Sequence, residues 1–202
     1  MIAVLFFAMC DFEIPLEIRN KDRAFEESFF QKKRLPIIIV LDNVRSSYNV
    51  GSVFRTADSA CIEKLYLCGY TPSPPNEKVK KTALGAIDYV PWEHHPDTLQ
   101  LVNYLKSEGI FTVAFETTSK SRNFFDFDFP NPCAMIFGNE KDGVGEEVLS
   151  AVDAILEVPA WGIKNSMNVA NVFGIVVYEV IRQYGKSGYI LPKEGGVIRR
   201  DL

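Results

Sequence analysis

The sequence predicts an α/β fold in which a mostly parallel sheet carries helices on both faces. Short runs rich in β-branched residues alternate with helical patterns between residues 36 and 184, which is typical of such sheets. The run LPIIIVLD at 35–42 is almost continuously apolar, as expected for a strand that is buried on both faces. A chain of 202 residues with 47% apolar residues can form one domain with a full hydrophobic core.

The individual elements follow from apolar spacing and turn signals. The apolar residues Val50, Val53, Phe54 and Ala57 recur at the spacing of a buried helical stripe and predict a helix over 49–60. By the same criteria we expect further strands at 64–69, 88–92, 110–116, 133–140 and 154–160, and helices at 76–86, 97–109, 145–152 and 168–185.

Three details of this assignment can be tested. We expect Asp97 to be the N-cap and Gly109 the C-cap of one helix, and Gly185 to close the last one. The segment NFFDFDFP at 123–130 alternates phenylalanine with aspartate, which predicts a strand or hairpin with one buried face. Base stacking by these rings is the alternative explanation.

The ends of the chain differ from this core. Residues 1–35 form an N-terminal extension that we expect to be helical, since a charged segment with interleaved phenylalanines runs over 17–34. The core domain spans 36–185, and the Gly-containing segment 186–202 is predicted to be a flexible tail. The apolar opening MIAVLFFAMC has no basic residue before it and is too short to span a bilayer, so we expect no membrane association.

Composition excludes some classes of site. The net charge of −4 argues only weakly against a nucleic-acid partner, because a local basic patch can coexist with an acidic chain. The two histidines, His94 and His95, are adjacent, and no metal-ligand spacing joins them to the cysteines, so no metal site is expected. The cysteines form no CxxC pair and are predicted to be buried free thiols of a reducing, cytoplasmic compartment: Cys10, Cys61, Cys68 and Cys133.

Three loops that follow predicted strands are rich in glycine and polar residues. They are DNVRSSYNVGSVFR at 42–55, FGNEKDGVGEE at 137–147 and PAWGIKNSMN at 159–168. Because ligands bind beyond the carboxyl ends of the strands in such sheets, these loops predict one polar pocket. The sequence has no GxGxxG, P-loop or GxSxG motif, so a Rossmann dinucleotide site, a P-loop and a nucleophile elbow are not supported.

The polar residues of these loops also have purely structural explanations. Asn49 could be the N-cap of its helix, and Arg55 could form a surface ion pair. Glu140 could be a solvated loop acid. Ser166 could cap the last helix, with Asn165 and Asn168 as competitors for that role.

The loop motifs resemble those of a known family. NVGSVFRTADSA, FGNEKDGVGEEVL and VPAWGIKNSMNVANVFGIVVYE are similar, in this order, to the signature motifs of the SpoU (TrmH-type) RNA ribose methyltransferases of the SPOUT class. The resemblance implies S-adenosylmethionine as methyl donor and a ribose 2'-hydroxyl of RNA as acceptor. It also implies a trefoil knot in the C-terminal part of the chain, and a homodimer.

The resemblance also assigns site residues. The cofactor would be held near Glu116 and Gly138 and by the segment from Val158 to Met167. Arg55 would be the central catalytic residue, and we favour a clamp on phosphate or oxyanion because a guanidinium offers no proton acceptor. Glu140 is a candidate proton acceptor, and Asn49 would orient Arg55 or the ribose. The full expected catalytic set is Asn49, Arg55, Glu140, Ser166 and Asn168.

The substrate is left open by the sequence. We favour transfer RNA, because a small core without a visible RNA-targeting domain suits a compact substrate. Ribosomal RNA is the alternative. A non-catalytic RNA-binding protein of the same fold and a small-molecule nucleotide-binding enzyme are further hypotheses.

Overall fold

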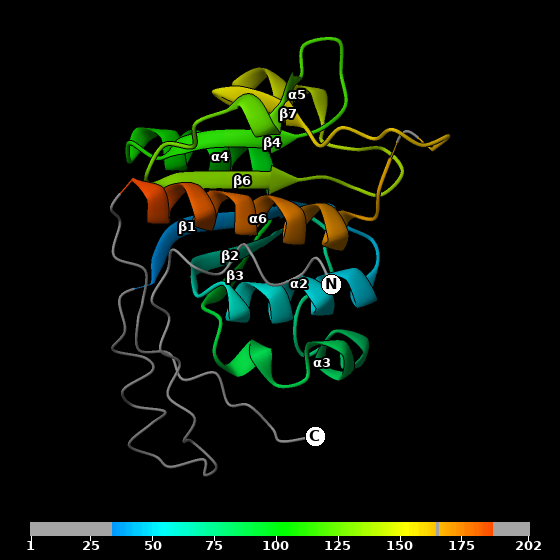
Figure 1. Ribbon diagram of the computed structural model, residues 1–202. Coiled ribbons are helices and arrows are strands. Elements are labelled where there is room, and N and C mark those ends of the chain that lie inside the picture. The colour runs from blue at the N-terminus through cyan, green and yellow to red at the C-terminus, as the bar shows by residue number, and fades with distance from the viewer. Residues whose placement is uncertain (1–33, 165, 188–202) are drawn as a thin grey trace, which may run out of the picture. The chain divides into compact units, whose positions relative to one another are not determined.

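The computed structural model describes residues 34–164 and 166–187, and these form a parallel sheet with helices on both faces (Figure 1). The seven strands lie in the order β3-β2-β1-β6-β4-β7-β5, and every pairing is parallel. The strands are β1 (Leu35–Asp42), β2 (Ile62–Cys68), β3 (Trp92–His95), β4 (Phe111–Phe115), β5 (Arg122–Asn123), β6 (Cys133–Phe137) and β7 (Ala154–Glu157).

Helices cover the two faces in pairs. On one face α6 runs across the sheet beside α2 (Figure 1). On the other face, α4 and α5 contribute Leu101, Leu105 and Val148 to a buried apolar cluster with side chains of β1, β2, β4 and β6. The helices are α2 (Ser47–Ser59), α3 (Glu77–Ala83), α4 (Thr98–Ser107), α5 (Glu146–Ala151) and α6 (Val169–Lys186), with short 3₁₀ turns at Ala86–Asp88 (η1) and Phe124–Asp126 (η2).

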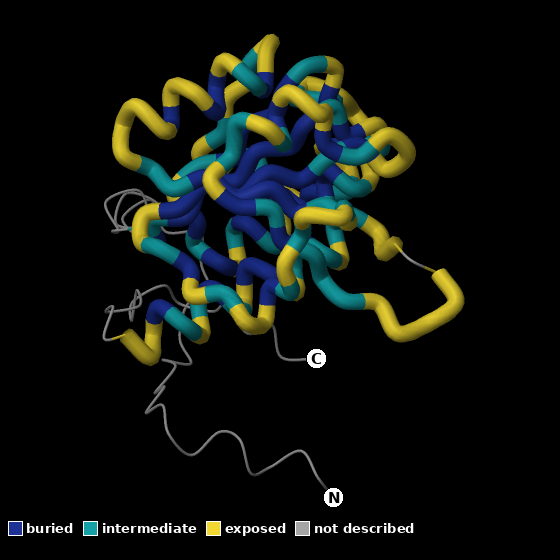
Figure 2. Tube along the Cα trace, turned by 90° about the horizontal axis from the view of Figure 1, so that it is seen from above, coloured by how far each residue is buried: buried dark blue, intermediate teal, exposed yellow. Residues whose placement is uncertain are grey.

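The predicted α/β architecture is therefore confirmed. The strands β1 and β6 lie at the centre and are buried on both faces, as the continuous apolar run at 35–42 predicted (Figure 2). Asp97 caps α4 as expected. The C-cap of α4 is Glu108, and Gly109 follows it with a φ of +77°, while α6 continues through Gly185 to Lys186. The prediction that these glycines are the terminal residues was wrong by one or two positions.

The strand predicted at 88–92 was wrong in position. The N–H groups of Tyr89 and Val90 both donate to the carbonyl of Ala86, which closes a turn. Pro91 has no N–H to offer a ladder, so β3 begins only at Trp92.

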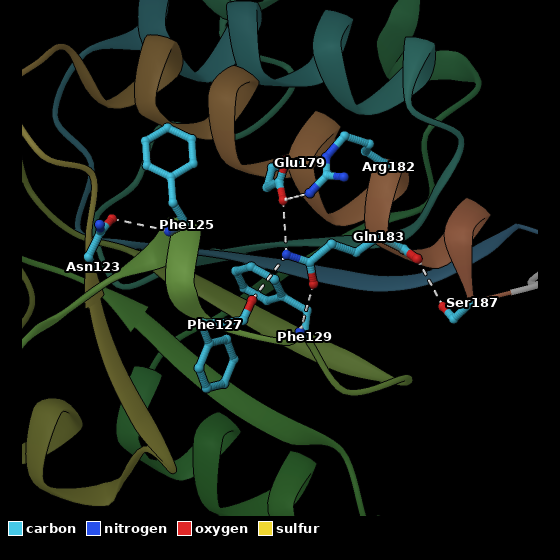
Figure 3. Close-up of polar contacts among 8 residues, drawn as sticks. All are labelled: Asn123, Phe125, Phe127, Phe129, Glu179, Arg182, Gln183 and Ser187. Carbon is cyan, nitrogen blue, oxygen red and sulfur yellow. Dashed lines mark hydrogen bonds and ion pairs between the residues drawn. The ribbon is translucent and has the colours of Figure 1, made fainter. Parts of the chain in front are cut away.

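The segment 123–130 is neither an extended strand nor a hairpin. Only two residues pair as β5, after which the Asn123 side chain accepts a hydrogen bond from the N–H of Phe125 and starts η2. Gln183 of α6 accepts from the N–H of Phe129 and donates to the carbonyl of Phe127, both at 3.0 Å (Figure 3). The Gln183 side chain of α6 therefore makes the backbone hydrogen bonds that a neighbouring strand would make to an extended segment.

Cys68 and Cys133 are buried free thiols as predicted, whereas Cys61 is half-buried. Cys10, the N-terminal extension through Lys33 and the tail from residue 188 lie outside the described residues. Burial raises the pKa of Cys68 to about 12. The nearby charges of Asp42 and Asp97 raise this pKa further, whereas a hydrogen bond with Thr98 lowers it.

The two buried thiols should therefore be unreactive in the folded protein. Burial raises the pKa of Cys133 to about 11, although a hydrogen bond from Tyr184 lowers it in part. Very little of either thiol is therefore ionised at pH 8. We expect iodoacetamide to leave Cys68 and Cys133 unmodified at pH 8 and to alkylate both in denaturant, as mapped by peptide mass spectrometry. Alkylation of either residue in the native protein would contradict this packing.

Candidate functional site

A pocket of about 420 Å³ lies where β4, β6 and β7 end and α6 begins. Ligand sites in open parallel sheets lie at this edge, and pockets for small ligands usually measure about 300–1,000 Å³. Stacked rings of Phe115 and Phe137, with centroids 5.1 Å apart, form part of its wall. Residues expected from the sequence that line the pocket are Glu116, Gly138, Glu140, Val158, Ser166, Met167 and Asn168.

A chain of hydrogen bonds joins the three glycine-rich loops beside this pocket. The Asn49 side chain donates to Glu140 Oε1 at 2.7 Å and accepts from Asn168 Nδ2 at 2.9 Å. The Asn168 side chain also accepts from the N–H of Ala170 and so caps α6. Each of the three sequence motifs therefore supplies one member of this chain.

These contacts settle two of the alternatives that the sequence left open. Ser46 is the N-cap of α2, so Asn49 is not the cap, and its side chain is available to the neighbouring loops. Asn168, rather than Ser166, caps α6. Ser166 is instead exposed at the pocket, in a loop whose residues 160–164 and 166–168 are largely exposed (Figure 2).

Glu140 holds the start of α2 in place. Its carboxylate accepts hydrogen bonds from the N–H groups of Arg45 at 2.8 Å and Ser46 at 3.1 Å, besides the one from Asn49. Burial by itself raises the pKa of Glu140. Four hydrogen bonds to the carboxylate have the opposite and larger combined effect, so the pKa is lowered; they come from Arg45, from the N–H of Glu140 itself, from Asn49 and from Ser46. A carboxylate held in this way is a weak base, so the geometry argues for positioning rather than proton abstraction.

Glu140→Gln should destabilise the protein in a pH-dependent way. Because the folded-state pKa lies below the ordinary value of 4.5, ionised Glu140 stabilises the fold at any pH above that value. This contribution is lost as the pH falls through the lowered pKa. We expect the variant to melt at a lower temperature than wild type at pH 7, and the difference to shrink below about pH 4. Thermal denaturation of both proteins from pH 3 to 7 measures this, and a constant difference would contradict the assignment.

The loop after β6 is tightly folded. The N–H and C=O groups of Asn139 and Gly143 bond to each other at 3.0 Å in both directions, and a Cβ added to Gly138 would collide with the backbone of Gly143 and Val144. Glu116 accepts from the N–H groups of Val144 and Thr117, both at 3.0 Å, and thereby ties this loop to the end of β4. The predicted cofactor residues Glu116 and Gly138 thus build the wall of the pocket.

Arg55 does not lie at the pocket of its own chain. It is exposed on α2, six residues after Asn49, which places it about 120° around the helix and about 9 Å along it. Its carbonyl accepts from the Ser59 hydroxyl, and its side chain has no protein partner among the described residues. The expectation that Asn49 orients Arg55 is therefore wrong for a single chain.

Two residues of this region were missed by sequence reasoning. Asn139 is buried and donates from Nδ2 to the carbonyl of Asn43 and to the hydroxyl of Tyr70. Asp42, also buried, accepts from the Thr98 hydroxyl and from the N–H of Gly145. Both stand inside the glycine-rich loops already singled out, so a polar residue directly after a buried strand was the available signal.

The described residues include no cluster of three or more metal-ligating side chains. Over the same residues, no helix combines the length and the apolar character that crossing a membrane requires.

Comparison with known proteins places these observations in a family. Residues 36–178 match the sequence profile described as the SpoU rRNA Methylase family. The tRNA (guanosine(18)-2'-O)-methyltransferase of Thermus thermophilus is 28% identical over 162 residues, which are 80% of this chain and 82% of that protein. The 23S rRNA (guanosine-2'-O-)-methyltransferase RlmB of Vibrio parahaemolyticus is 28% identical over 148 residues, 73% of this chain and 60% of that protein.

Solved structures give the same result. The TrmH/SpoU tRNA modifying enzyme of A. aeolicus superposes with a TM-score of 0.73 at 26% identity, covering 84% of this chain and 89% of that one. The AdoMet-bound rRNA methyltransferase from Sinorhizobium meliloti has a TM-score of 0.68 at 26% identity, covering 72% of this chain and 56% of that one.

Proposed function

Because the chain belongs to the SpoU methylase family, we propose that it transfers a methyl group from S-adenosylmethionine to a ribose 2'-hydroxyl of RNA. The observation that carries the proposal is the hydrogen-bonded chain from Glu140 through Asn49 to Asn168, which ties the three motif loops together beside the pocket. A non-catalytic RNA-binding protein would need no such pocket with hydrogen-bonded loops around it, so the pocket favours an enzyme.

Transfer RNA is the substrate that we favour. The match covers 82% of the Thermus tRNA methyltransferase but only 60% of the Vibrio 23S rRNA enzyme. The rRNA enzyme therefore has more sequence that this chain does not match. Ribosomal RNA remains the alternative substrate. We propose a cytoplasmic location, which is supported by the RNA substrate and by the free thiols of Cys68 and Cys133.

The pocket residues fit the cofactor. Glu116 has carboxylate acceptor capacity beyond its two backbone hydrogen bonds, so it can accept from ribose hydroxyls of the cofactor. Val158 and Met167 offer apolar contact, and the loop at Gly138 offers backbone groups. When bound, S-adenosylmethionine supplies an electrophilic methyl group on a sulfonium.

The residues of this chain have distinct proposed roles in the reaction. Ser166 and Asn168 hold the ribose at the pocket mouth, and Asn49 and Glu140 keep the loops in register. Arg55 binds the adjacent phosphate or the developing oxyanion, and its charge favours loss of the 2'-hydroxyl proton. Since Glu140 is already saturated with hydrogen bonds, we assign proton acceptance to the substrate phosphate.

The position of Arg55 supports the proposal of a second chain. It lies on the solvent face of α2 together with Tyr48, whose side chain is 59% exposed, and α6 presents the exposed apolar residues Ile175 and Tyr178 nearby. We propose a homodimer in which Arg55 of one chain completes the pocket of its partner. Exposed apolar side chains on adjacent helices are what such an interface requires.

The proposed domain layout follows the family match. The methyltransferase domain spans 36–185, with an N-terminal extension at 1–35 and a tail at 186–202. We further propose that the C-terminal part forms a trefoil knot. The strand order supports it, because β7 lies beyond β4 while α6 returns across the sheet to pack against α2.

Calorimetric titration tests the proposal against its rivals. We expect S-adenosylmethionine to bind with a Kd between about 1 μM and 1 mM, the usual range of enzyme substrates, and ATP not to bind. Transfer RNA should then bind to the cofactor complex. RNA binding without cofactor binding would support a non-catalytic RNA-binding protein, and binding of ATP alone would support a nucleotide enzyme.

A further inference from the structure

Tyr70 is an exposed aromatic residue that is nevertheless held at both ends. Its side chain is 61% exposed, yet its hydroxyl accepts from Asn139 Nδ2 at 2.6 Å. Its backbone N–H donates to Asn43 Oδ1 at 3.2 Å. The preceding Gly69 has a φ of +60°, and a Cβ there would collide with the Asn43 side chain, so the turn that presents Tyr70 is closely specified.

This ring lies beside the pocket. Asn139, which holds the hydroxyl, lines the pocket and directly precedes Glu140. The strands β2, β1 and β6 are neighbours in the sheet, so the loops that carry Tyr70, Asn43 and Asn139 meet at one edge. An RNA strand whose ribose is methylated at the pocket can continue over this edge.

Beyond Tyr70, the chain enters α3, which carries three exposed lysines. Lys78, Lys80 and Lys81 are exposed and form no ion pair within the described part of the chain, although the whole protein has a net charge of −4. The helix is fixed against α2, where a Cβ on Gly51 would collide with Thr82. These lysines therefore stand on an anchored helix that follows the loop of Tyr70 in the chain.

An exposed ring with fixed orientation and several exposed lysines on the following helix suit single-stranded RNA. Bases stack on aromatic side chains while lysines contact the phosphates, and only an unpaired base has a free face to offer. We propose that Tyr70 stacks on an unpaired base next to the methylated nucleotide and that the lysines of α3 hold the neighbouring phosphates. This proposal rests on the proposed RNA methyltransferase function and narrows its substrate to loops or single strands.

Substitution of Tyr70 separates stacking from a structural role. Tyr70→Ala should weaken binding of the methyl-accepting RNA fraction about 5- to 150-fold, the usual loss for one stacked base. Tyr70→Phe keeps the ring but loses the bond to Asn139, and it should bind within about twofold of wild type. Tyr104→Ala, at a tyrosine of α4 that is 54% exposed, is the matched control and should change nothing. All three should bind S-adenosylmethionine like wild type.

Stacking also has a spectroscopic signature. A short single-stranded RNA that contains 2-aminopurine should lose fluorescence on binding to wild type and to Tyr70→Phe, but not on binding to Tyr70→Ala. Pairing the same RNA with its complement should abolish the change. Replacing Lys78, Lys80 and Lys81 by glutamine should reduce the slope of log affinity against log salt by about 2, whereas Lys186→Gln should leave it unchanged.

The outcomes are distinct. If Tyr70→Phe is as impaired as Tyr70→Ala, the hydroxyl contact to Asn139 is what matters and the stacking proposal is overturned. An unimpaired Tyr70→Ala overturns it as well, provided that wild type methylates RNA. If wild type binds neither S-adenosylmethionine nor RNA, the underlying function fails instead.

Discussion

Arg55→Ala should lower kcat by about 100- to 1,000-fold, the usual cost of removing one group that stabilises developing negative charge. The affinity for S-adenosylmethionine should stay unchanged, because the role proposed for Arg55 is to bind the RNA phosphate or the developing oxyanion and not the cofactor. Arg55→Lys keeps the charge but loses the planar fork, so it should remain at least about tenfold slower than wild type. Steady-state methyl transfer measures kcat of both variants, and calorimetric titration measures their affinity for S-adenosylmethionine. Full activity of Arg55→Lys would rule out the bidentate clamp.

A mixing experiment tests whether Arg55 acts on the partner's pocket. Ser166→Trp should block the pocket without disturbing the fold, because Ser166 is exposed at its mouth. Mixing this variant with Arg55→Ala should restore about a quarter of wild-type activity, since half of the dimers would be mixed and each would have one intact site. No recovery, with mixed dimers demonstrated, would place Arg55 in its own chain's site.

Gly138→Ala should abolish cofactor binding and destabilise the fold. The added methyl group would overlap the backbone of Gly143 and Val144, so the loop after β6 must move away from Glu116. Overpacking of this kind costs about 1–3 kcal/mol, and the pocket wall would move with the loop. Urea denaturation measures the first effect, and calorimetry with S-adenosylmethionine measures the second.

Gly145→Ala is the matched control for this variant. Gly145 lies in the same loop, its φ of −58° is ordinary for alanine, and an added Cβ meets nothing within 4 Å. Gly145 is the N-cap of α5 but makes no side-chain cap hydrogen bond, so we expect wild-type cofactor affinity and a loss of unfolding free energy below about 1 kcal/mol. If both glycine variants lost cofactor affinity and stability to the same extent, the close packing at Gly138 would not be the cause of these losses.

The fold was predictable where one signal dominated. The apolar run at 35–42 could only be buried on both faces, and Asp97 stood directly before a helical stripe. At 123–130 the alternation of phenylalanine with aspartate was correctly noticed, but the partner was Gln183 of α6, far away in the sequence. A contact of this range leaves no trace in local periodicity, which explains the wrong strand.

The site was predictable as a set of loops and only partly as contacts. Glycine-rich segments after three strands indicated a shared pocket, and the residues Glu140, Asn49 and Asn168 do lie together. The resemblance of the motifs, rather than their periodicity, pointed to methyl transfer. Neither the glycine-rich loops nor the motif resemblance showed that Arg55 lies outside the pocket of its own chain. Its place depends on the angle between positions 49 and 55 around α2.

The most direct test of the proposed activity is transfer of labelled methyl groups from S-adenosylmethionine to purified transfer RNA and, separately, to ribosomal RNA. We expect label in the transfer RNA fraction, recovered after nuclease digestion as a 2'-O-methylated nucleoside and absent with Arg55→Ala. No label in either RNA, together with no binding of S-adenosylmethionine, would contradict the assignment of this chain as an RNA ribose methyltransferase.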